Sequence, residues 1–375
     1  MVQANSSALL AGLAAVATAR KCQNLTVPIS ITASNTHFKL QAPSNNVEVT
    51  DFVLNLAQPG ANYTAEVLGD TPFASVSGNY TIGATYCTPD SGPGTALQVL
   101  THGIAFDRWY WDFPVQNRKY SYADAALARN YSVFFYDRLG LGESSHGEPV
   151  NEIQAAMEVQ ALRALTTKLR DTSVPGIKDT YAKVVHVGHS FGSVQSYALV
   201  AAYPELSDGV ALSGFSQALG DFVPYFLFAA DFVEAAGASP ALAAYPAGYL
   251  ASSDKSAVQS NFFAPGNFDP AVLDAAYTTG QPVTVGELMT IGTAAAGNNS
   301  YGGPVLVITG DRDIPFCGGN CSISEPSIPA QVGEYFTNAS PFEAVVVSGT
   351  GHGLNLGYSA HEVYASILDF FDKNV

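Results

Sequence analysis

The fold of this chain is decided by one stretch, Val184-Val185-His186-Val187-Gly188-His189-Ser190-Phe191-Gly192. The apolar run Val184–Val187 predicts a short buried strand, and residues 193–203 have the pattern of a helix. A Gly-x-Ser-x-Gly sequence between a strand and a helix is typical of a sharp turn that strains the serine backbone and exposes its hydroxyl. The stretch therefore predicts Ser190 as a nucleophile at a strand-to-helix turn.

Short apolar runs alternate with helical stretches on both sides of this turn, from Leu97 to the C-terminus. This alternation indicates a parallel sheet, and right-handed connections place helices on both of its faces. We therefore expect an α/β fold with a mainly parallel, doubly wound sheet. The expected strands are Leu97–Leu100, Val133–Tyr136, Val184–Val187, Val210–Leu212, Val305–Ile308 and Ala344–Val347, and the expected helices are Tyr122–Asn130, Glu152–Leu169, Ser193–Tyr203 and His361–Lys373.

Two intervals depart from this alternation. From Arg20 to Ala96 the pattern is β-like, with Val47–Leu54 and Gly78–Ile82 as examples, and it indicates antiparallel strands. Residues 215–303 show no strand pattern and are rich in alanine and aromatic residues, so we expect a mainly helical insertion over the strand ends. The chain then divides into a signal peptide (1–19), an N-terminal β region (20–96), a core (97–214 and 304–375) and a helical cap insertion (215–303).

A serine hydroxyl becomes a good nucleophile when a neighbouring base removes its proton. We expect the base on the loop after the last strand, where Gly351-His352-Gly353 places a histidine between two glycines. The other histidines are less suitably placed. His186 lies within a strand run, His189 is the variable position of the turn, His37 and His146 lie in polar loops, and His361 begins a helix.

The acid that orients this base is expected after the preceding strand, where Asp311 and Asp313 compete. Asp313 is favoured because the extra length of chain lets it point back toward His352. We expect Asp311 to cap the turn or to pair with Arg312. The resulting order of serine, aspartate and histidine differs from the orders in chymotrypsin and subtilisin.

The negative oxygen that forms during attack on a carbonyl needs two preorganised N–H donors. Phe191 follows the nucleophile and is expected to supply one from its backbone. Ile104, in the loop after Leu97–Leu100, is expected to supply the second, with Gly103 allowing close approach. We interpret His102 as a structural hydrogen-bonding residue.

Together these motifs resemble the α/β-hydrolase superfamily, in the branch of simple esterases, lactonases and prolyl aminopeptidases. The resemblance covers about residues 97–214 and 304–375, and the N-terminal β region is similar to that of secreted fungal members. It implies acyl transfer without a cofactor, a structural role for Asp137-Arg138, and a nucleophile unlike the aspartate of epoxide hydrolases and dehalogenases. The motifs that carry it are Leu100-Thr101-His102-Gly103, Tyr136–Ser145, Gly188–Gly192, Gly310-Asp311-Arg312-Asp313 and Gly351-His352-Gly353.

Aromatic residues offer candidates for a substrate pocket. Trp109 and Trp111 follow the loop of Ile104, and they either form an aromatic wall of the site or pack this loop beneath the insertion. Phe226 is the candidate from the insertion, although most aromatic residues there are expected to pack its own small core.

The composition limits the classes of partner that the protein is expected to bind. The formal net charge is -16, and charged residues make up only 13% of the chain. A surface of this sign repels the phosphates of nucleic acids and anionic membranes. We expect neither a nucleic-acid partner nor a membrane span, and the sequence is silent on oligomeric state.

The N-terminus and the surface motifs predict a secreted protein. Ser7–Ala19 is an uncharged run of small and apolar residues, and Ala17-Thr18-Ala19 fits a signal-peptide cleavage site. Cys317 and Cys321 are close enough in sequence for a local disulfide, which leaves Cys22 to pair with Cys87; a metal site would need further ligands nearby. Glycosylation sequons occur at Asn24, Asn62, Asn79, Asn130, Asn298, Asn320 and Asn338.

The sequence therefore predicts a secreted serine hydrolase that cleaves an ester or lactone of a small apolar substrate, without a metal or organic cofactor. Three alternatives stay open: a peptidase of the aminopeptidase type on the same fold, a lyase or cyclase that uses the same three residues, and a non-catalytic binding module.

Overall fold

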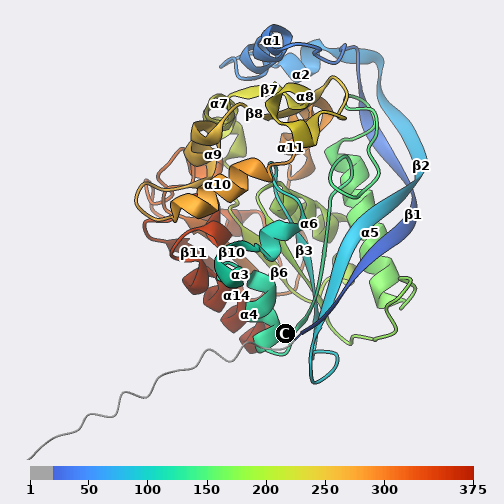
Figure 1. The fold of residues 1–375 in the computed structure, drawn as a ribbon, viewed down its shortest axis with the longest axis vertical. Helices are drawn as coiled ribbons and strands as arrows, with labels where there is room; N and C mark the ends of the chain where they lie inside the picture. Colours follow the sequence, from blue (N-terminus) through green and yellow to red (C-terminus); the bar gives the residue numbers. More distant parts are fainter. Residues whose placement is uncertain (1–19) are drawn as a thin grey trace, which may run out of the picture.

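A mainly parallel sheet of eight strands forms the centre of the molecule (Figure 1). The computed structural model describes residues 20–375, so the predicted signal peptide lies outside the described residues. The strand order is β1-β2-β4-β3-β5-β6-β10-β11, and every neighbouring pair from β4 to β11 is parallel. The predicted α/β class is confirmed. The parallel strands are β3 (Leu97–Thr101), β4 (Ser132–Tyr136), β5 (Val184–His189), β6 (Val210–Ser213), β10 (Val305–Gly310) and β11 (Phe342–Val347).

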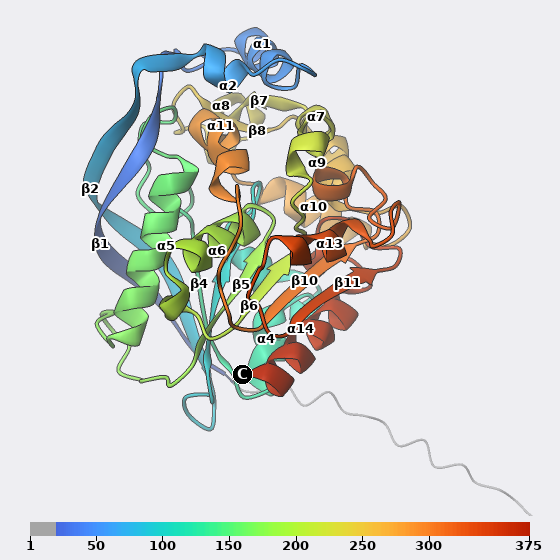
Figure 2. The ribbon, with the colours of Figure 1, turned by 180° about the vertical axis from the view of Figure 1, so that it is seen from behind.

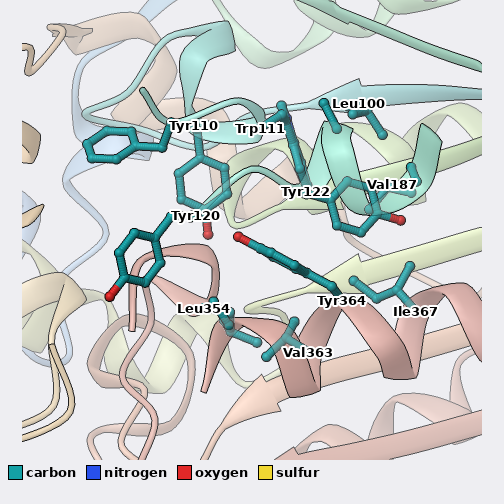
Figure 3. Close-up of a cluster of buried hydrophobic side chains, with 14 of the residues drawn as sticks. Leu100, Tyr110, Trp111, Tyr120, Tyr122, Val187, Leu354, Val363, Tyr364 and Ile367 are labelled. Atoms are coloured by element: carbon teal, nitrogen blue, oxygen red, sulfur yellow. The ribbon is translucent and has the colours of Figure 1, made fainter. Parts of the chain in front are cut away.

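Helices cover both faces of this sheet. Successive side chains of a strand point to opposite faces, so Phe134 and Phe135 of β4 belong to different hydrophobic clusters. The cluster around Phe135 lies against α4 and α14, where Tyr364 meets Tyr122 (Figure 3). No helix within residues 20–375 is long and apolar enough to cross a membrane. The four core helices are α4 (Tyr122–Ala128), α5 (Ala155–Arg170), α6 (Phe191–Ala202) and α14 (Ala360–Asn374).

The N-terminal region is a long antiparallel ribbon of β1 (Arg20–Phe38) and β2 (Leu68–Pro89). β2 joins the main sheet through β4, so the ribbon extends one edge of the sheet. At its far end α1 (Asn46–Leu56) and α2 (Tyr63–Glu66) lie beside the cap (Figure 1). There the N–H of Glu234 donates to Oδ1 of Asn46 over 3.0 Å.

The strand expected at Val47–Leu54 is wrong, because these residues belong to helix α1. The alternation of Val47 with Val49 resembles a strand, but Val47 is 70% exposed. The residues that are buried have the spacing of one helix face. Asn45 begins the helix by accepting hydrogen bonds from two backbone N–H groups of its first turn. The buried residues are Val49, Phe52 and Val53.

The cap insertion is mainly helical, as expected, but it also contains a small antiparallel sheet that the sequence pattern did not indicate. Its strands have two to four residues, which is too short for an alternating pattern to be recognised. Figure 2 shows the cap above the ends of the parallel strands. Its elements are α7 (Leu219–Ala230), β7 (Phe232–Glu234), α8 (Ala235–Ala238), β8 (Tyr249–Ser252), α9 (Lys255–Phe262), α10 (Pro270–Thr278), β9 (Val283–Thr284) and α11 (Val285–Ala294).

A buried cluster of charges joins this cap to the core. Arg138 follows β4, and its Nη1 lies 2.7 Å from Oε2 of Glu158 on α5 and 2.5 Å from Oε1 of Glu287 on α11. Glu287 also caps its own helix, because its carboxylate accepts the N–H of Thr284. Burial, followed by the nearby Glu287, raises the pKa of Glu158 well above its usual value. One cation thus lies between two carboxylates, one from the core and one from the cap.

The structure contains both predicted disulfides, Cys22–Cys87 and Cys317–Cys321. Cys22 and Cys87 face one another across the β1–β2 ribbon, and the second pair closes a loop that begins just after Asp313. The sequence separations are 65 and 4 residues, so the first bridge removes far more freedom from the unfolded chain.

We expect the double variant C22S/C87S to lose about 4 kcal/mol of unfolding free energy and C317S/C321S to lose about 2 kcal/mol, from the loop lengths that each bridge closes. Urea unfolding of both variants beside the wild type measures the two losses. A larger loss in C317S/C321S would show that the short bridge stabilises the native loop directly, and it would contradict the loop-entropy argument.

Candidate active site

Ser190 occupies a strained turn between β5 and α6. Its φ is 55° and its ψ is -120°, a conformation that residues with a side chain rarely adopt. The turn is held by the hydrogen bond from Ser190 N–H to the carbonyl oxygen of Ser213, over 2.9 Å. A Cβ atom at Gly192 would overlap the carbonyl oxygen of Thr101, and one at Gly103 would lie 2.7 Å from Cβ of Ser190. The loop after β3 therefore lies directly against Ser190.

His352 and Asp313 form a buried pair at the same end of the sheet. Nδ1–H of His352 donates to Oδ2 of Asp313 over 2.6 Å, while Oδ1 of Asp313 accepts the N–H of Phe316 over 2.8 Å. Nε2 of His352 is buried and has no hydrogen-bond partner among the described residues, so it makes no hydrogen bond with Ser190. The pair thus leaves Nε2 as a free acceptor, and such contacts often shorten only when a substrate is bound.

Asp311 contacts the histidine loop in a different way. Its Oδ1 accepts the N–H of Thr350 over 3.1 Å, and it makes no hydrogen bond with His352. The expectation that it caps a turn agrees with this contact. The alternative pairing with Arg312 is wrong, because no ion pair within residues 20–375 includes the guanidinium of Arg312.

The loop that carries Ile104 is held by His102. Nδ1–H of His102 donates to the carbonyl oxygen of Gly103 over 2.8 Å, and Nε2 accepts the N–H of Arg138 over 3.1 Å. Burial, followed by the positive charge of Arg138, lowers the pKa of His102 well below its usual value, so the ring is neutral and both bonds are satisfied. Ile104 N–H and Phe191 N–H are bonded to no acceptor elsewhere in the described chain.

His189 contributes a feature that sequence reasoning did not identify. Its ring is stacked on Tyr110 with centroids 4.4 Å apart, and it lies 4.8 Å from the ring of His352. Nδ1–H donates to Oγ of Ser213 over 3.2 Å, which leaves Nε2 buried and unpaired. Burial, followed by the neighbouring His352, lowers the pKa of His189 well below its usual value. In the sequence His189 is recognisable only as the variable position of the Gly-x-Ser-x-Gly motif, and no pattern there indicates that its ring stacks on Tyr110.

Phenylalanine rings complete the surroundings of His352. Phe262 of the cap and Phe316, in the segment after β10, both have ring centroids 5.6 Å from the imidazole. The backbone of the cap is joined to the same loop, because Gly353 N–H donates to the carbonyl oxygen of Phe262 over 2.8 Å. The histidine is therefore enclosed by aromatic carbon on the side of the cap.

The predicted pocket residues lie in different environments. Trp111 is fully buried and packs between Tyr110 and Tyr122 in the core cluster of Figure 3, which favours the packing role left open by the sequence. Trp109 is partly buried beside Phe135, and Phe226 is buried against Phe232 within the cap. All three therefore have packing partners of their own.

Asp107, in the segment after β3, is a carboxyl group with a raised pKa. Asp107 caps the short helix Arg108–Trp111 by accepting the N–H of Trp109 over 2.9 Å. Burial, followed by the carboxylate of Asp137, raises the pKa of Asp107 to about 7. Asp137 itself is paired with Arg108 over 2.6 Å.

Across residues 20–375 no three His, Cys, Asp or Glu side chains are grouped to hold a metal ion.

Comparisons with known proteins show the family and the fold of the chain. A family model described as "Alpha/beta hydrolase family" matches residues 98–367. The solved structures that are similar include an esterase from Thermogutta terrifontis, with TM-score 0.50, 16% identity, and coverage of 78% of this chain and 94% of that chain. An alpha/beta hydrolase fold protein from Chitinophaga pinensis has TM-score 0.51, 13% identity, and coverage of 78% and 94%. Epoxide hydrolase A from Mycobacterium thermoresistibile has TM-score 0.50, 17% identity, and coverage of 79% and 96%.

At these identities the similarity is one of fold. No curated protein sequence matches the chain.

The raised pKa of Asp107 makes stability depend on pH. The folded state holds this proton up to about pH 7, whereas the ordinary value is 3.8, so the stabilising contribution of the protonated group is present below pH 3.8 and lost as the pH rises through 7. Asp107→Asn keeps the capping oxygen but cannot ionise. Between about pH 5 and pH 8 we expect the stability of the variant to rise by about 1–2 kcal/mol relative to wild type. Denaturant unfolding of both proteins at pH 5 and pH 8 measures their free energies of unfolding. The same difference between variant and wild type at the two pH values would contradict the prediction.

Proposed function

The chain belongs to the alpha/beta hydrolase family, and from this we propose that it is a serine hydrolase that cleaves an ester or lactone of a small apolar substrate. The observation that carries the proposal is the Asp313–His352 pair, whose Nε2 is free, at the sheet end where Ser190 is held in a strained turn. Serine, histidine and aspartate in these roles support acyl transfer.

The proposed mechanism assigns one step to each group. Nε2 of His352 removes the proton of Ser190 while Oγ attacks the carbonyl carbon, and Asp313 holds the imidazole with Nε2 directed away from the carboxylate. The N–H groups of Ile104 and Phe191 stabilise the negative oxygen. His352 then protonates the leaving alcohol. In the second half of the reaction His352 takes the proton of a water molecule that attacks the acyl-enzyme, and it returns that proton to Ser190 as the acid product leaves.

The surroundings of the pair support a substrate of apolar character. Phe262 and Phe316 present carbon surfaces around His352, and the cap covers the strand ends. Serine at position 190 supports an acyl-enzyme route, because epoxide hydrolases of the resembled family use aspartate there. No described contact identifies an anchor for the amine of a peptide.

We also propose that the protein is secreted and glycosylated. Two disulfides support an oxidising compartment. The exposure of each of the seven predicted asparagines supports glycan attachment at these sites. These asparagines are Asn24, Asn62, Asn79, Asn130, Asn298, Asn320 and Asn338.

Labelling with a fluorophosphonate tests the nucleophile. Ser190→Ala should abolish both labelling and ester hydrolysis while the melting temperature stays close to that of the wild type, because the variant removes one hydroxyl. Ser196→Ala is a matched control, since Ser196 lies on α6 and its hydroxyl donates within the helix, to the carbonyl oxygen of Gly192. Full labelling of the Ser190→Ala protein would exclude the assignment.

Paired aspartate variants test the acid. Asp313→Asn should lower kcat by roughly 10⁴-fold, because an amide neither stabilises the imidazolium nor holds the required tautomer. Asp311→Asn should lower it far less, since Asp311 contacts the backbone of Thr350 and not His352. The reverse order of the two effects would show that Asp311 is the acid.

A substrate panel tests the reaction class. We expect hydrolysis of short p-nitrophenyl esters and of small lactones, with no release of amine from aminoacyl p-nitroanilides. Turnover of the anilides alone would favour the peptidase alternative. Labelling of Ser190 without hydrolysis of any panel member would favour a lyase or cyclase, and an absence of both would favour a binding module.

A further inference from the structure

Asp313 stands at the start of a helix that is too short to hold its own shape. It caps α12 (Ile314–Cys317), which has only four residues. A single helical turn is unfavourable by itself, because several backbone angles are fixed for one hydrogen bond. The conformation of α12, and with it the direction of the Asp313 carboxylate, is therefore maintained by contacts outside the helix.

Phe316 on α12 touches both members of the buried pair. Its N–H donates to Oδ1 of Asp313 over 2.8 Å, and the other oxygen of that carboxylate accepts Nδ1–H of His352. Its ring lies against the imidazole of His352, with an angle of 22° between the two planes. Its carbonyl oxygen accepts the hydroxyl of Ser216 over 2.6 Å. A shift of the Phe316 backbone would therefore disturb Asp313 and His352 together.

The Cys317–Cys321 disulfide follows Phe316 directly and folds the chain back toward the end of β10. The N–H of Cys321 donates to the carbonyl oxygen of Asp311 over 3.0 Å. The N–H of the glycine two residues before Cys321 donates to the carbonyl oxygen of Asp313 over 2.7 Å. The bridged turn thus holds the backbone of Asp313, while Phe316 holds its carboxylate.

The turn between the two cysteines is flexible by composition. Gly318 and Gly319 both lie in the left-handed region, with φ of 62° and 89°. Glycine adopts this region without strain, but it also loses more conformational freedom on folding than any other residue. The disulfide closes these two glycines into a small ring, and its sulfur atoms are buried in an apolar cluster that includes Ile328. The covalent bond therefore restricts a segment that few other constraints hold.

We propose that the Cys317–Cys321 bridge is a positioning element that keeps the carboxylate of Asp313 directed at His352. The inference rests on the proposed function, because it gives the bridge a part in acyl transfer. The bridge acts through the neighbouring Phe316 and through the backbone of Asp313. Its effect on the reaction is therefore expected to exceed its modest effect on global stability.

The Cys22–Cys87 bridge supplies a matched control within the same chain. Cys87 is paired with Val133 near the beginning of β4, whereas Ser190 and His352 lie beyond the ends of β5 and β11. Because β4, β5 and β11 belong to the parallel part of the sheet, the control bridge lies at the opposite end from the candidate site. It also closes the longer loop, so its removal should destabilise the fold more.

Kinetics of the two bridge variants with a short p-nitrophenyl ester test the proposal. C317A/C321A should lower kcat by about tenfold to a hundredfold with KM close to that of the wild type, which is the scale for a misplacement of about 1 Å. Alanine avoids burying a hydroxyl in the apolar cluster around the bridge. C22A/C87A should keep kcat although its melting temperature falls further. An unchanged kcat in C317A/C321A, or an equal loss in C22A/C87A, would overturn the proposal.

Combination with Asp313→Asn shows whether the bridge acts through the carboxylate. Removal of the bridge from the Asp313→Asn protein should lower kcat no further, because the amide already lacks the interaction that the bridge maintains. Losses that multiply in the triple variant would show a general structural effect, and they would overturn the positioning role.

Hydrogen exchange of the full chain examines the turn without any turnover. In C317A/C321A the amides of Phe316 and Gly319 should exchange about tenfold faster or more, while those of β5 stay as in the wild type. Unchanged exchange at these two amides would overturn the proposal even if Ser190 reacts fully with a fluorophosphonate. A wild type that is neither labelled nor hydrolytic would instead overturn the proposed function, and the exchange rates would still show whether the bridge holds the turn.

Discussion

Three stretches of backbone meet at Ser190 without side chains between them, and the geometry of the site depends on this contact. The end of β3, the end of β5 and the start of α6 approach so closely that a Cβ atom at Gly192 or Gly103 would overlap or crowd its neighbour. The positive φ of Ser190 is therefore imposed from several directions at once. A conformation of this kind costs about 1–3 kcal/mol and persists where the surrounding structure determines it. The same contact places the loop of Ile104 beside the serine.

Arg138 connects this arrangement to the rest of the molecule. Its side chain holds Glu158 of the core and Glu287 of the cap, and its guanidinium lies 4.7 Å from the ring of Phe191. Its backbone N–H holds His102 and so the loop after β3. Loss of a buried cation from such a cluster leaves uncompensated carboxylates and typically costs about 3–5 kcal/mol. One residue thus supports the cap, the loop and the first turn of α6.

The core of the fold could be predicted because continuous apolar runs and helical periods were long enough to identify the six parallel strands and four helices. The Asp313–His352 contact followed from the position of each residue after a strand. Local sequence patterns were misleading where tertiary contacts decide which secondary structure a segment adopts. The helix at Asn46–Leu56 presents only one buried face, and the cap strands are too short to show a period.

The features that no pattern indicated are relations between distant side chains. The stacking of His189 on Tyr110 joins residues from β5 and the loop after β3. Likewise, the full burial of Trp111 depends on α4 and α14. A sequence motif locates reactive groups along the chain, but it does not say which neighbours surround them.

The cap is attached to the body of the protein at several separated points: Glu287 to Arg138, Glu234 to α1 at the end of the ribbon, and Phe262 to the histidine loop. A lid that swings as a rigid body needs a hinge on one side and freedom on the others. The three attachments lie at separate places, so a swing of the whole cap about any one of them would break the other two. Entry of a small molecule that leaves all three intact requires local movement of side chains and short loops, and such movement admits only small molecules.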